Sequence, residues 1–271
     1  MNLNTVIRGE GQAVFFQHGL GGDINQVLHF LSGIEKCKII STDLAGHGKS
    51  PFTGLEDVSF DQFADSVISV ADKLNIEAGI FGGISMGASI ALNIALRYPG
   101  RVQALIIIRP AWLDKPHPVN LEPLFQLGEN SRSVTNENIH IFPYFNTLFK
   151  NYPYLKTVSQ DLINNNHSSL IGGLFQQIIN DTPVKDIHGL QSIGIPTLIL
   201  ASKDDFLHPL EIARSLHENL TNVIYRELPS RYRETQKFEC YATRYIQQFL
   251  SEWSDCTSRH RVPEKCFTKK S

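Results

Sequence analysis

The segment Gly83-Ile84-Ser85-Met86-Gly87 decides how this chain folds. It follows an apolar run at residues 78–82 and precedes a helical pattern at residues 89–98. Small residues at positions 83 and 87 let a strand and a helix approach closely, while the serine between them takes a strained backbone. The pattern G-x-S-x-G is weak in isolation. Placed between a strand and a helix, it predicts a nucleophile elbow that projects the Ser85 hydroxyl above a sheet.

Apolar runs and helical periods alternate along the rest of the chain. Runs typical of buried strands also lie at residues 13–17, 38–42, 102–108, 197–201 and 223–228. Helical periods lie between them, and Ser59 with Gln62 forms a capping box at the start of one. Right-handed crossovers between parallel strands place helices on both faces of the sheet. The chain is therefore predicted to be an α/β protein with a mostly parallel, doubly wound sheet.

The alternation stops at residues 113–186, which are rich in aromatic residues and asparagine. Loops of that length are uncommon in compact domains, so we expect a small, mostly helical insertion there. Residues 1–112 and 187–253 then form one core domain. Residues 254–271 are polar and are expected to be a disordered tail.

The composition fits one enzyme-sized domain, since 42% of the 271 residues are apolar. The formal charge is −2 with the basic residues dispersed, which argues against binding to nucleic acid or anionic lipid. Residues 1–11 lack the apolar region of a signal peptide, and no run reaches the roughly 18 apolar residues of a membrane span. The four cysteines show no CxxC spacing. We expect a cytoplasmic protein with reduced thiols and a small-molecule partner; the oligomeric state stays open.

Four ordered motifs make residues 5–252 resemble the α/β-hydrolase superfamily, in the branch with a cap inserted after strand 6. The motifs are HGLGG at 18–22, DLAGHGKS at 43–50, GISMG at 83–87 and DFLHP at 205–209. The resemblance implies an α/β-hydrolase fold with residues 113–186 as a helical cap. A dehalogenase of this fold would need a carboxylate at position 85, so that branch is disfavoured.

The same resemblance implies the parts of a serine hydrolase site. Ser85 is then the nucleophile, and the backbone N–H groups of Leu20 and Met86 form the oxyanion hole. Asp205 is the acid after the seventh strand. The neighbouring Asp204 is an alternative, but the spacing to Pro209 favours Asp205.

The base histidine of the family does not occur where it is expected, after the last strand. That stretch, residues 230–240, contains no histidine. Without a base the serine hydroxyl is a poor nucleophile. His208, three residues after Asp205, is the one plausible substitute, although it could equally brace the helix that begins after Pro209. Four further histidines are weaker candidates or structural: His117, His140 and His167 in the insertion, and His18, which we expect to brace its glycine turn.

Arg109 and Trp112 are candidate substrate-binding residues at the carboxyl edge of the sheet, where open α/β folds bind ligands. Arg109 would hold a carboxylate, or it would form an ion pair that fixes the insertion. Trp112 would form a pocket wall, or it would pack at the hinge of the insertion.

No pattern in the sequence indicates a metal or a cofactor. Histidine, cysteine and carboxylate residues do not cluster at ligand spacing, and the glycine turns match neither G-x-G-x-x-G nor the P-loop.

Two functions follow from these residues. The first is a serine hydrolase that acts on a carboxylic ester or thioester of a small molecule. The second is a catalytically impaired member of the fold that binds a small molecule or a partner without turnover. Retention of the elbow, the oxyanion turn and the acid favours the hydrolase.

Overall fold

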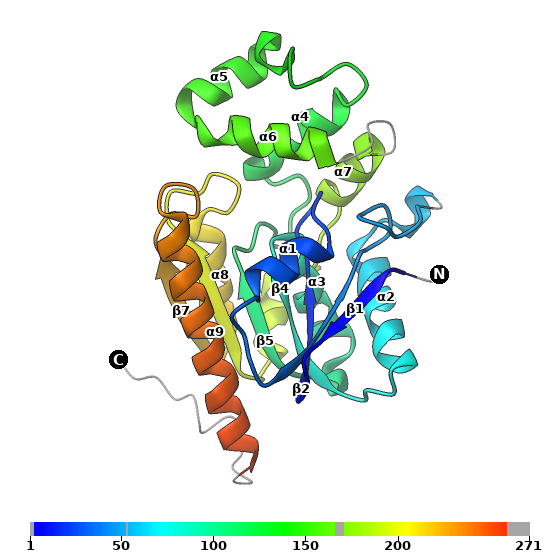
Figure 1. Cartoon of the computed structure of the whole chain (residues 1–271), viewed down its shortest axis with the longest axis vertical. Helices are drawn as coiled ribbons and strands as arrows, with labels where there is room; N and C mark the ends of the chain where they lie inside the picture. The colour runs from blue at the N-terminus through cyan, green and yellow to red at the C-terminus, as the bar shows by residue number, and fades with distance from the viewer. Residues whose placement is uncertain (1–2, 53, 166–170, 259–271) are drawn as a thin grey trace.

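The computed structural model describes residues 3–52, 54–165 and 171–258. Seven strands form one sheet: β1 (Thr5–Arg8), β2 (Gln12–Gln17), β3 (Cys37–Thr42), β4 (Gly79–Ile84), β5 (Val102–Ile108), β6 (Thr197–Ser202) and β7 (Val223–Leu228). Their order is β1-β3-β2-β4-β5-β6-β7, and every neighbouring pair is parallel except β1 with β3. The predicted mostly parallel α/β sheet is therefore confirmed (Figure 1).

Side chains that alternate along the strands divide the core into two layers. Phe15 and Phe81 face the layer that contains helices α2 (Phe60–Lys73), α3 (Met86–Arg97) and α8 (Leu210–Asn219). Val14, Phe16 and Ile80 face the opposite layer, with α1 (Ile24–Phe30) and α9 (Thr235–Ser258). This division follows from the two-residue period of a strand, which points successive side chains to opposite faces. The sheet is thus covered on both sides, as the crossover rule predicts.

Two helices begin at side chains that accept backbone hydrogen bonds. The Ser59 hydroxyl accepts from the Gln62 N–H at 3.0 Å and starts α2, as the capping box predicts. The Asp23 carboxylate accepts from the N–H groups of Asn25 and Gln26 and starts α1. Helix α1 and the short antiparallel strand β1 were not anticipated, because segments of 7 and 4 residues carry little periodic signal.

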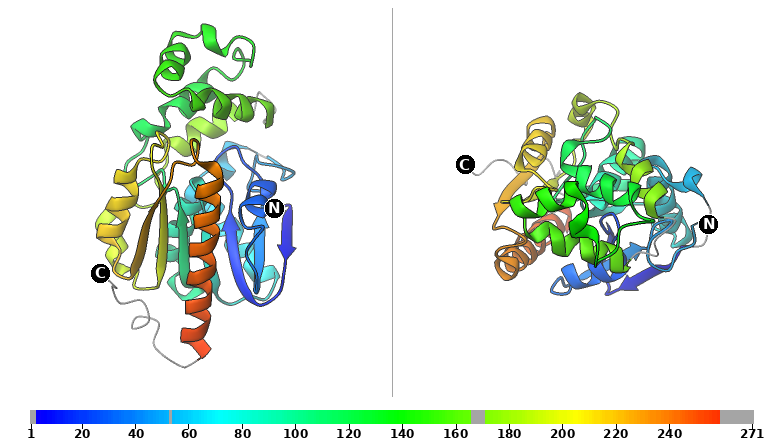
Figure 2. Two further views of the ribbon diagram at one scale, coloured as in Figure 1. Left: turned by 60° about the vertical axis from the view of Figure 1, so that its left-hand side comes forward. Right: turned by 90° about the horizontal axis from the view of Figure 1, so that it is seen from above.

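Between β5 and β6 the chain forms α4 (Glu122–Glu129), α5 (Pro143–Asn151), α6 (Tyr154–Asn165) and α7 (Ile171–Ile179). Figures 1 and 2 show these helices gathered above the ends of the strands, on one side of the molecule. They follow the fifth strand of this chain, whereas the family count predicts a cap after strand 6. The loop of Asp205 is shifted in the same way, since it follows the sixth strand, β6.

Helix α9 continues to Ser258, past Trp253, so residues 254–258 are helical and not part of a disordered tail. Trp253 is buried against the sheet layer that α9 covers, and the backbone hydrogen bonds of the helix extend one turn beyond that contact. Residues 259–271 lie outside the described part of the chain.

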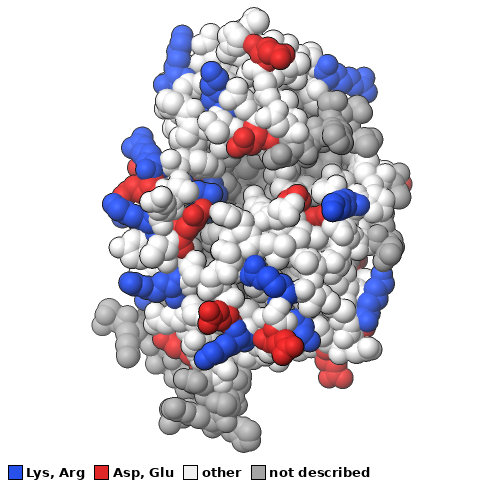
Figure 3. Space-filling model, viewed as in Figure 1, with Lys and Arg blue, Asp and Glu red and all other residues white. Residues whose placement is uncertain are grey.

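Across the described residues no helix is both long enough and apolar enough to cross a bilayer. On the face shown in Figure 3, lysine and arginine side chains alternate with aspartate and glutamate. That face therefore carries no large field of one sign.

Two glycines let β4 and α3 meet closely at the nucleophile elbow. A Cβ added at Gly83 would overlap the backbone of Gly87, and one added at Gly87 would overlap the carbonyl group of Gln17. These obstacles are backbone atoms, which cannot rotate away. The close approach of β2, β4 and α3 therefore requires glycine at both positions.

Gly87→Ala is expected to lower the free energy of unfolding by about 1–3 kcal/mol, because the added methyl group must displace backbone. Gly100→Ala is the matched control, since an added Cβ there meets no atom within 4 Å. It should change stability by no more than about 0.5 kcal/mol. Urea unfolding of the two variants measures the difference, and equal stabilities would contradict the close-packed elbow.

Candidate active site

A cavity of about 800 Å³ opens at the carboxyl ends of the central strands, between the sheet and α6. Ser85 lines it, at the junction of β4 and α3, with φ 56° and ψ −111°. Positive φ is rare for a residue other than glycine and marks the strained turn that the G-x-S-x-G pattern predicts. The Ser85 N–H donates to the carbonyl of Ile108 at 3.0 Å, which fixes this backbone to β5.

The HGLGG turn also lines the cavity, through Gly19, Leu20 and the two glycines that follow. The Gln26 side chain accepts from the Gly19 N–H at 2.8 Å and holds the turn against α1. His18 is fully buried and braces the other side: its Nε2 accepts from the Leu44 N–H at 3.2 Å, and its Nδ1 bonds to the Gly19 carbonyl at 2.9 Å. His18 thus has the bracing position that we expected.

The two predicted oxyanion donors come from the HGLGG turn and from the residue that follows Ser85. Leu20 lines the cavity, and Met86 is the first residue of α3, with its side chain buried in the core. Within the described residues neither amide donates a hydrogen bond. Free N–H groups beside a helix N-terminus are suited to hold an oxyanion.

Asp205 lies on the loop after β6, with its carboxylate fully buried. Arg109 contacts it from the end of β5: Nε donates to Oδ2 at 2.7 Å. Burial alone raises the pKa of a carboxyl group, but the Arg109 guanidinium and the His208 imidazole outweigh it and hold the pKa of Asp205 well below its usual range. Asp205 is therefore a buried carboxylate anion, whereas the Asp204 side chain is 61% exposed and pairs with Arg233.

Tyr232 comes from the loop after β7, where the family places its base histidine. Arg109 Nη2 donates to the Tyr232 hydroxyl at 2.8 Å, and the guanidinium also lies 5.2 Å from the centre of the ring. A phenol is a poor base at neutral pH, so Tyr232 does not replace the histidine as a base. Its position after the last strand was the signal that it would lie beside the acid.

His208 lies against Asp205 on the same loop. Its Nδ1 is 3.0 Å from Asp205 Oδ1 and 2.9 Å from Arg109 Nη2. His208 lines the cavity that Ser85 lines, and within the described residues its Nε2 has no partner and is not sealed from solvent. The structure thus brings Ser85 and His208 to one cavity, and Asp205 contacts His208 without lining that cavity. No hydrogen bond between described residues joins Ser85 to an imidazole.

The Nδ1 atom of His208 can satisfy only one of its two neighbours at a time. If Nδ1 carries the proton, it donates to Asp205 and Nε2 keeps a lone pair for the cavity. If Nδ1 is unprotonated, it accepts from Arg109 and Nε2 carries the proton. Burial, then Arg109, lower the pKa of His208, and Asp205 opposes them only in part, so the imidazole is neutral near pH 7. Which nitrogen holds the proton decides whether His208 is a base.

Among the histidines that the structure describes, His208 alone lines this cavity. His117 contacts Glu122 at 2.6 Å and Asn180 at 3.2 Å, and His140 is exposed in a short helical turn of the insertion. His167 and His260 lie outside the described residues. Among the side chains that the structure describes, no three of His, Cys, Asp and Glu gather as metal ligands do.

Two predictions about substrate contacts have different outcomes. Trp112 is fully buried and packs edge-on against Phe60 at 5.5 Å. The ring packs on α2, and Trp112 does not line this cavity, so the structure gives no support to a pocket-wall role. Arg109 forms the ion pair that was the alternative for it, but its partner is Asp205 itself, and it lines the cavity as well.

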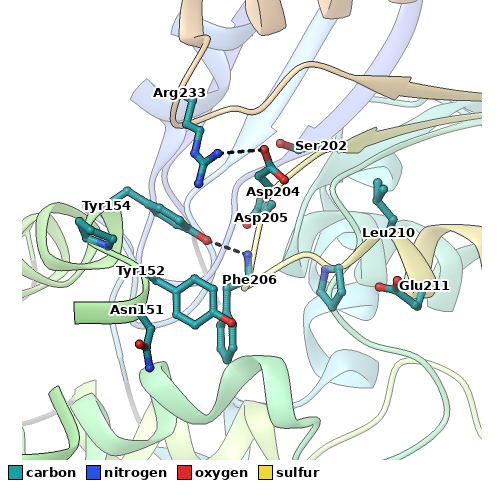
Figure 4. A pocket seen from close by; sticks show the side chains of 12 residues that line it. Asn151, Tyr152, Tyr154, Ser202, Asp204, Asp205, Phe206, Leu210, Glu211 and Arg233 are labelled. Atoms are coloured by element: carbon teal, nitrogen blue, oxygen red, sulfur yellow. Dashed lines mark hydrogen bonds and ion pairs between the residues drawn. The ribbon is translucent and has the colours of Figure 1, made fainter. Parts of the chain in front are cut away.

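A second cavity, of about 580 Å³, lies on the other side of the Asp205 loop, between that loop and the start of α6. Figure 4 shows Arg233 directed toward Asp204 and the Tyr154 hydroxyl toward the backbone of Phe206. The Phe206 N–H donates to Tyr154 at 2.7 Å, and the Tyr154 ring stacks on Tyr232 at 4.2 Å. Tyr154 thus joins α6 to the loop after β6, which carries Asp205, and to the loop after β7, which carries Tyr232.

Arg109→Met is expected to lower the free energy of unfolding at pH 7 by about 3–5 kcal/mol, because it leaves the Asp205 carboxylate buried without its cation. In the wild type the folded pKa of Asp205 is depressed, so its stabilisation is present above the ordinary value of 3.8 and is lost as the pH falls through the folded pKa. In the variant the carboxyl group is expected to take up a proton more readily. The gap between the two proteins should therefore narrow at pH 4.

Urea unfolding at pH 7 and pH 4 measures this gap. Arg214→Met, which breaks the exposed pair with Glu227, is the matched control and should have a much smaller effect. An Arg109 variant no less stable than the control would contradict the buried pair.

Comparisons with known proteins agree with the fold described above. The family described as alpha/beta hydrolase fold matches residues 12–239. The AB hydrolase superfamily protein YisY of Bacillus subtilis is 26% identical over 233 residues, which cover 78% of this chain and 81% of that protein. A solved meta-cleavage product hydrolase from Pseudomonas fluorescens IP01 shares the fold with a TM-score of 0.75 at 19% identity, over 92% of this chain and 94% of that one.

A third relative matches over a shorter stretch. It is the dihydrolipoyllysine-residue acetyltransferase component of the acetoin cleaving system of Pseudomonas putida, 35% identical over 134 residues and 49% of this chain. The match spans about a third, 36%, of that relative's own length. Because the family matches most of the chain and Ser85 lies in the strained turn between β4 and α3, this protein belongs to the α/β-hydrolase family.

Proposed function

We propose that this chain is a serine hydrolase that cleaves a carboxylic ester or thioester of a small molecule, with Ser85 as nucleophile, His208 as base and Asp205 as acid. One observation carries the proposal: a buried carboxylate contacts Nδ1 of an imidazole that shares a cavity with the elbow serine. The relatives support hydrolysis as the class of reaction, since they include proteins named as hydrolases.

In the proposed reaction Asp205 accepts the Nδ1 proton of His208 in a hydrogen bond, which leaves a lone pair on Nε2. Nε2 takes the proton of the Ser85 hydroxyl as its oxygen attacks the acyl carbon. The N–H groups of Leu20 and Met86 stabilise the oxyanion that forms. His208 then returns the proton to the leaving alcohol or thiol. His208 then takes a proton from water, whose oxygen attacks the acyl carbon. The bond to the Ser85 oxygen breaks, the carboxylic acid leaves, and His208 returns the proton to Ser85.

A base on the acid's own loop is what distinguishes this arrangement from that of the family. Tyr232 lies on the loop after β7, where the family places its base histidine. A hydrogen bond from Arg109 holds Tyr232 there. His208 approaches Asp205 from three residues along the same loop. The base has then moved from one loop to another while the carboxylate has stayed.

The second candidate is a binding protein that retains the fold without turnover. The 2.9 Å contact from Arg109 Nη2 to His208 Nδ1 favours it, because that contact requires the tautomer with the proton on Nε2. Ser85 then has no base, and the cavity binds its ligand unchanged. Labelling of the serine separates the two functions.

A fluorophosphonate probe is expected to label wild-type protein at Ser85 and not to label Ser85→Ala, since only an activated hydroxyl attacks phosphorus. Mass spectrometry of the peptide that contains residue 85 identifies the adduct. Absence of labelling under conditions that modify a control esterase would contradict the hydrolase and favour the binding protein.

His208→Gln is expected to lower kcat/KM for a short p-nitrophenyl ester by about 10³-fold or more, as loss of a triad base does. His29→Gln is the matched control, because His29 is 75% exposed on α1 and does not line the cavity. Adding Tyr232→His to the His208 variant places an imidazole at the family position and is expected to restore part of the rate. Undiminished turnover in His208→Gln would exclude His208 as the base.

The pH profile of kcat/KM gives an independent check on His208. Burial and Arg109 lower the pKa of this imidazole below its ordinary value of 6.5, so the neutral, basic form persists below that pH. Activity is expected to fall on the acid side only below pH 6.5. An acid limb centred at or above 6.5 would point to a different, unperturbed base.

A further inference from the structure

The corner of the cavity beside Asp205 is lined by hydrogen-bond donors that the proposed reaction does not use. Arg109, Tyr232, Tyr154 and Arg231 all line the cavity that contains Ser85. Two of these side chains are guanidinium cations, and the other two are phenols. An ordinary pocket for a neutral ester would have apolar walls with few charges.

Arg109 has donors to spare after it binds Asp205. Its Nε and Nη2 atoms contact Asp205, His208 and Tyr232. Within the described residues Nη1 has no hydrogen-bond partner, and it is not sealed from solvent. The Arg109 side chain is 10% exposed. Arg109 lines this cavity and not the second one. The free Nη1 therefore offers its N–H groups to a ligand beside Ser85.

The Arg109 backbone indicates that this position is constrained. Its φ is 49°, in the left-handed region that non-glycine residues seldom adopt, and its N–H donates to the Leu200 carbonyl at 2.8 Å. Strain of this kind persists where the surrounding structure enforces it, often at functional sites. The strained residue is a buried cation, which suggests that its placement serves a ligand as well as Asp205.

Tyr232 is a donor toward the same space. Its hydroxyl oxygen already accepts a hydrogen bond from Arg109, so the phenolic proton remains to be donated. Burial, which outweighs the attraction of Arg109, raises the pKa of Tyr232 and keeps that proton in place. The stacked ring of Tyr154 closes the corner from α6. Within the described residues no acceptor is paired with the Tyr232 O–H.

Arg231 adds a second positive charge. Its side chain is 30% exposed, and its guanidinium makes one loose ion pair, 3.4 Å from Glu239, without a hydrogen bond within the described residues. Burial, and then repulsion by Arg109, lower the pKa of Arg231. An anion between or beside the two guanidinium groups would relieve that repulsion.

We propose that Arg109 Nη1 and the Tyr232 hydroxyl, supported by the charge of Arg231, bind a carboxylate group of the substrate. The proposal rests on the proposed function and names its substrate class: a small ester or thioester that carries a free carboxylate. A monoanion suits the cavity better than a phosphoryl dianion, because the carboxylates of Asp23 and Asp161 also line it. Tyr232 is then a specificity-determining residue in the place of the family's base.

A matched pair of ester substrates, measured with two variants, tests this site. The substrates are p-nitrophenyl butyrate and mono-p-nitrophenyl glutarate, which differ by a terminal carboxylate. Wild-type protein should prefer the charged ester. Tyr232→Phe and Arg231→Gln should each lower the charged-to-neutral ratio of kcat/KM by about 10- to 100-fold, as loss of a hydrogen bond to a charged group does.

Tyr152→Phe and Arg233→Gln are the controls and should leave the ratio unchanged. Both residues line the second cavity and not the first, and the Arg233 side chain is 73% exposed. Arg231→Lys, which keeps the charge, should retain most of the preference. A ratio that is unaffected in Tyr232→Phe and Arg231→Gln overturns the carboxylate site.

Calorimetric titration with glutarate and with its uncharged diamide tests binding without turnover. Wild-type protein should bind glutarate at least tenfold more tightly than the diamide, and Tyr232→Phe should lose the difference. Equal affinities overturn the site, and tighter binding of inorganic phosphate overturns the carboxylate assignment. Fluorophosphonate labelling without anion preference contradicts this inference alone, whereas anion preference without labelling contradicts the proposed hydrolysis alone.

Discussion

The buried ion pair between Arg109 and Asp205 is the interaction on which the rest of the site depends. Two charges removed from water are costly unless each is fully hydrogen-bonded, and here the partners come from the ends of two adjacent strands, β5 and β6. Nε satisfies one oxygen of Asp205, which leaves the other for His208. The same guanidinium holds the Tyr232 hydroxyl. One cation therefore sets the charge of the acid, the place of Tyr232 and the neighbours of the candidate base.

Tyr154 connects helix α6 to the residues around this ion pair. Tyr154 begins α6, stacks on Tyr232 and accepts a hydrogen bond from Phe206, the residue after Asp205. A displacement of α6 that separates these rings would expose the face of Tyr232 and with it the Arg109 network. Tyr154 and Tyr232, which hold α6 to the site, also line the cavity. Substrate entry and the environment of Asp205 are expected to change together.

Most of the fold could be predicted from the sequence, because strand and helix periods are local signals. The runs at 78–82 and 102–108, the Ser59 cap and the elbow could all be predicted from neighbouring residues. The site was harder, because its decisive contacts join residues far apart in the chain. Arg109 meets Asp205 across 96 positions and Tyr232 across 123. Trp112 shows the same limit: a large aromatic near a strand end lines a pocket or fills the core depending on partners such as Phe60 that spacing does not reveal.

We infer that Asp205, rather than Arg109, sets the tautomer of His208. Nitrogen-15 NMR of the protein labelled at histidine, with His208→Gln to assign the signals, measures it directly. At pH 7 we predict a proton on Nδ1 and an unprotonated Nε2. When Asp205 is replaced by asparagine, the proton should no longer be held on Nδ1. A proton on Nε2, with Nδ1 as the acceptor from Arg109, would contradict the claim and leave Ser85 without a base.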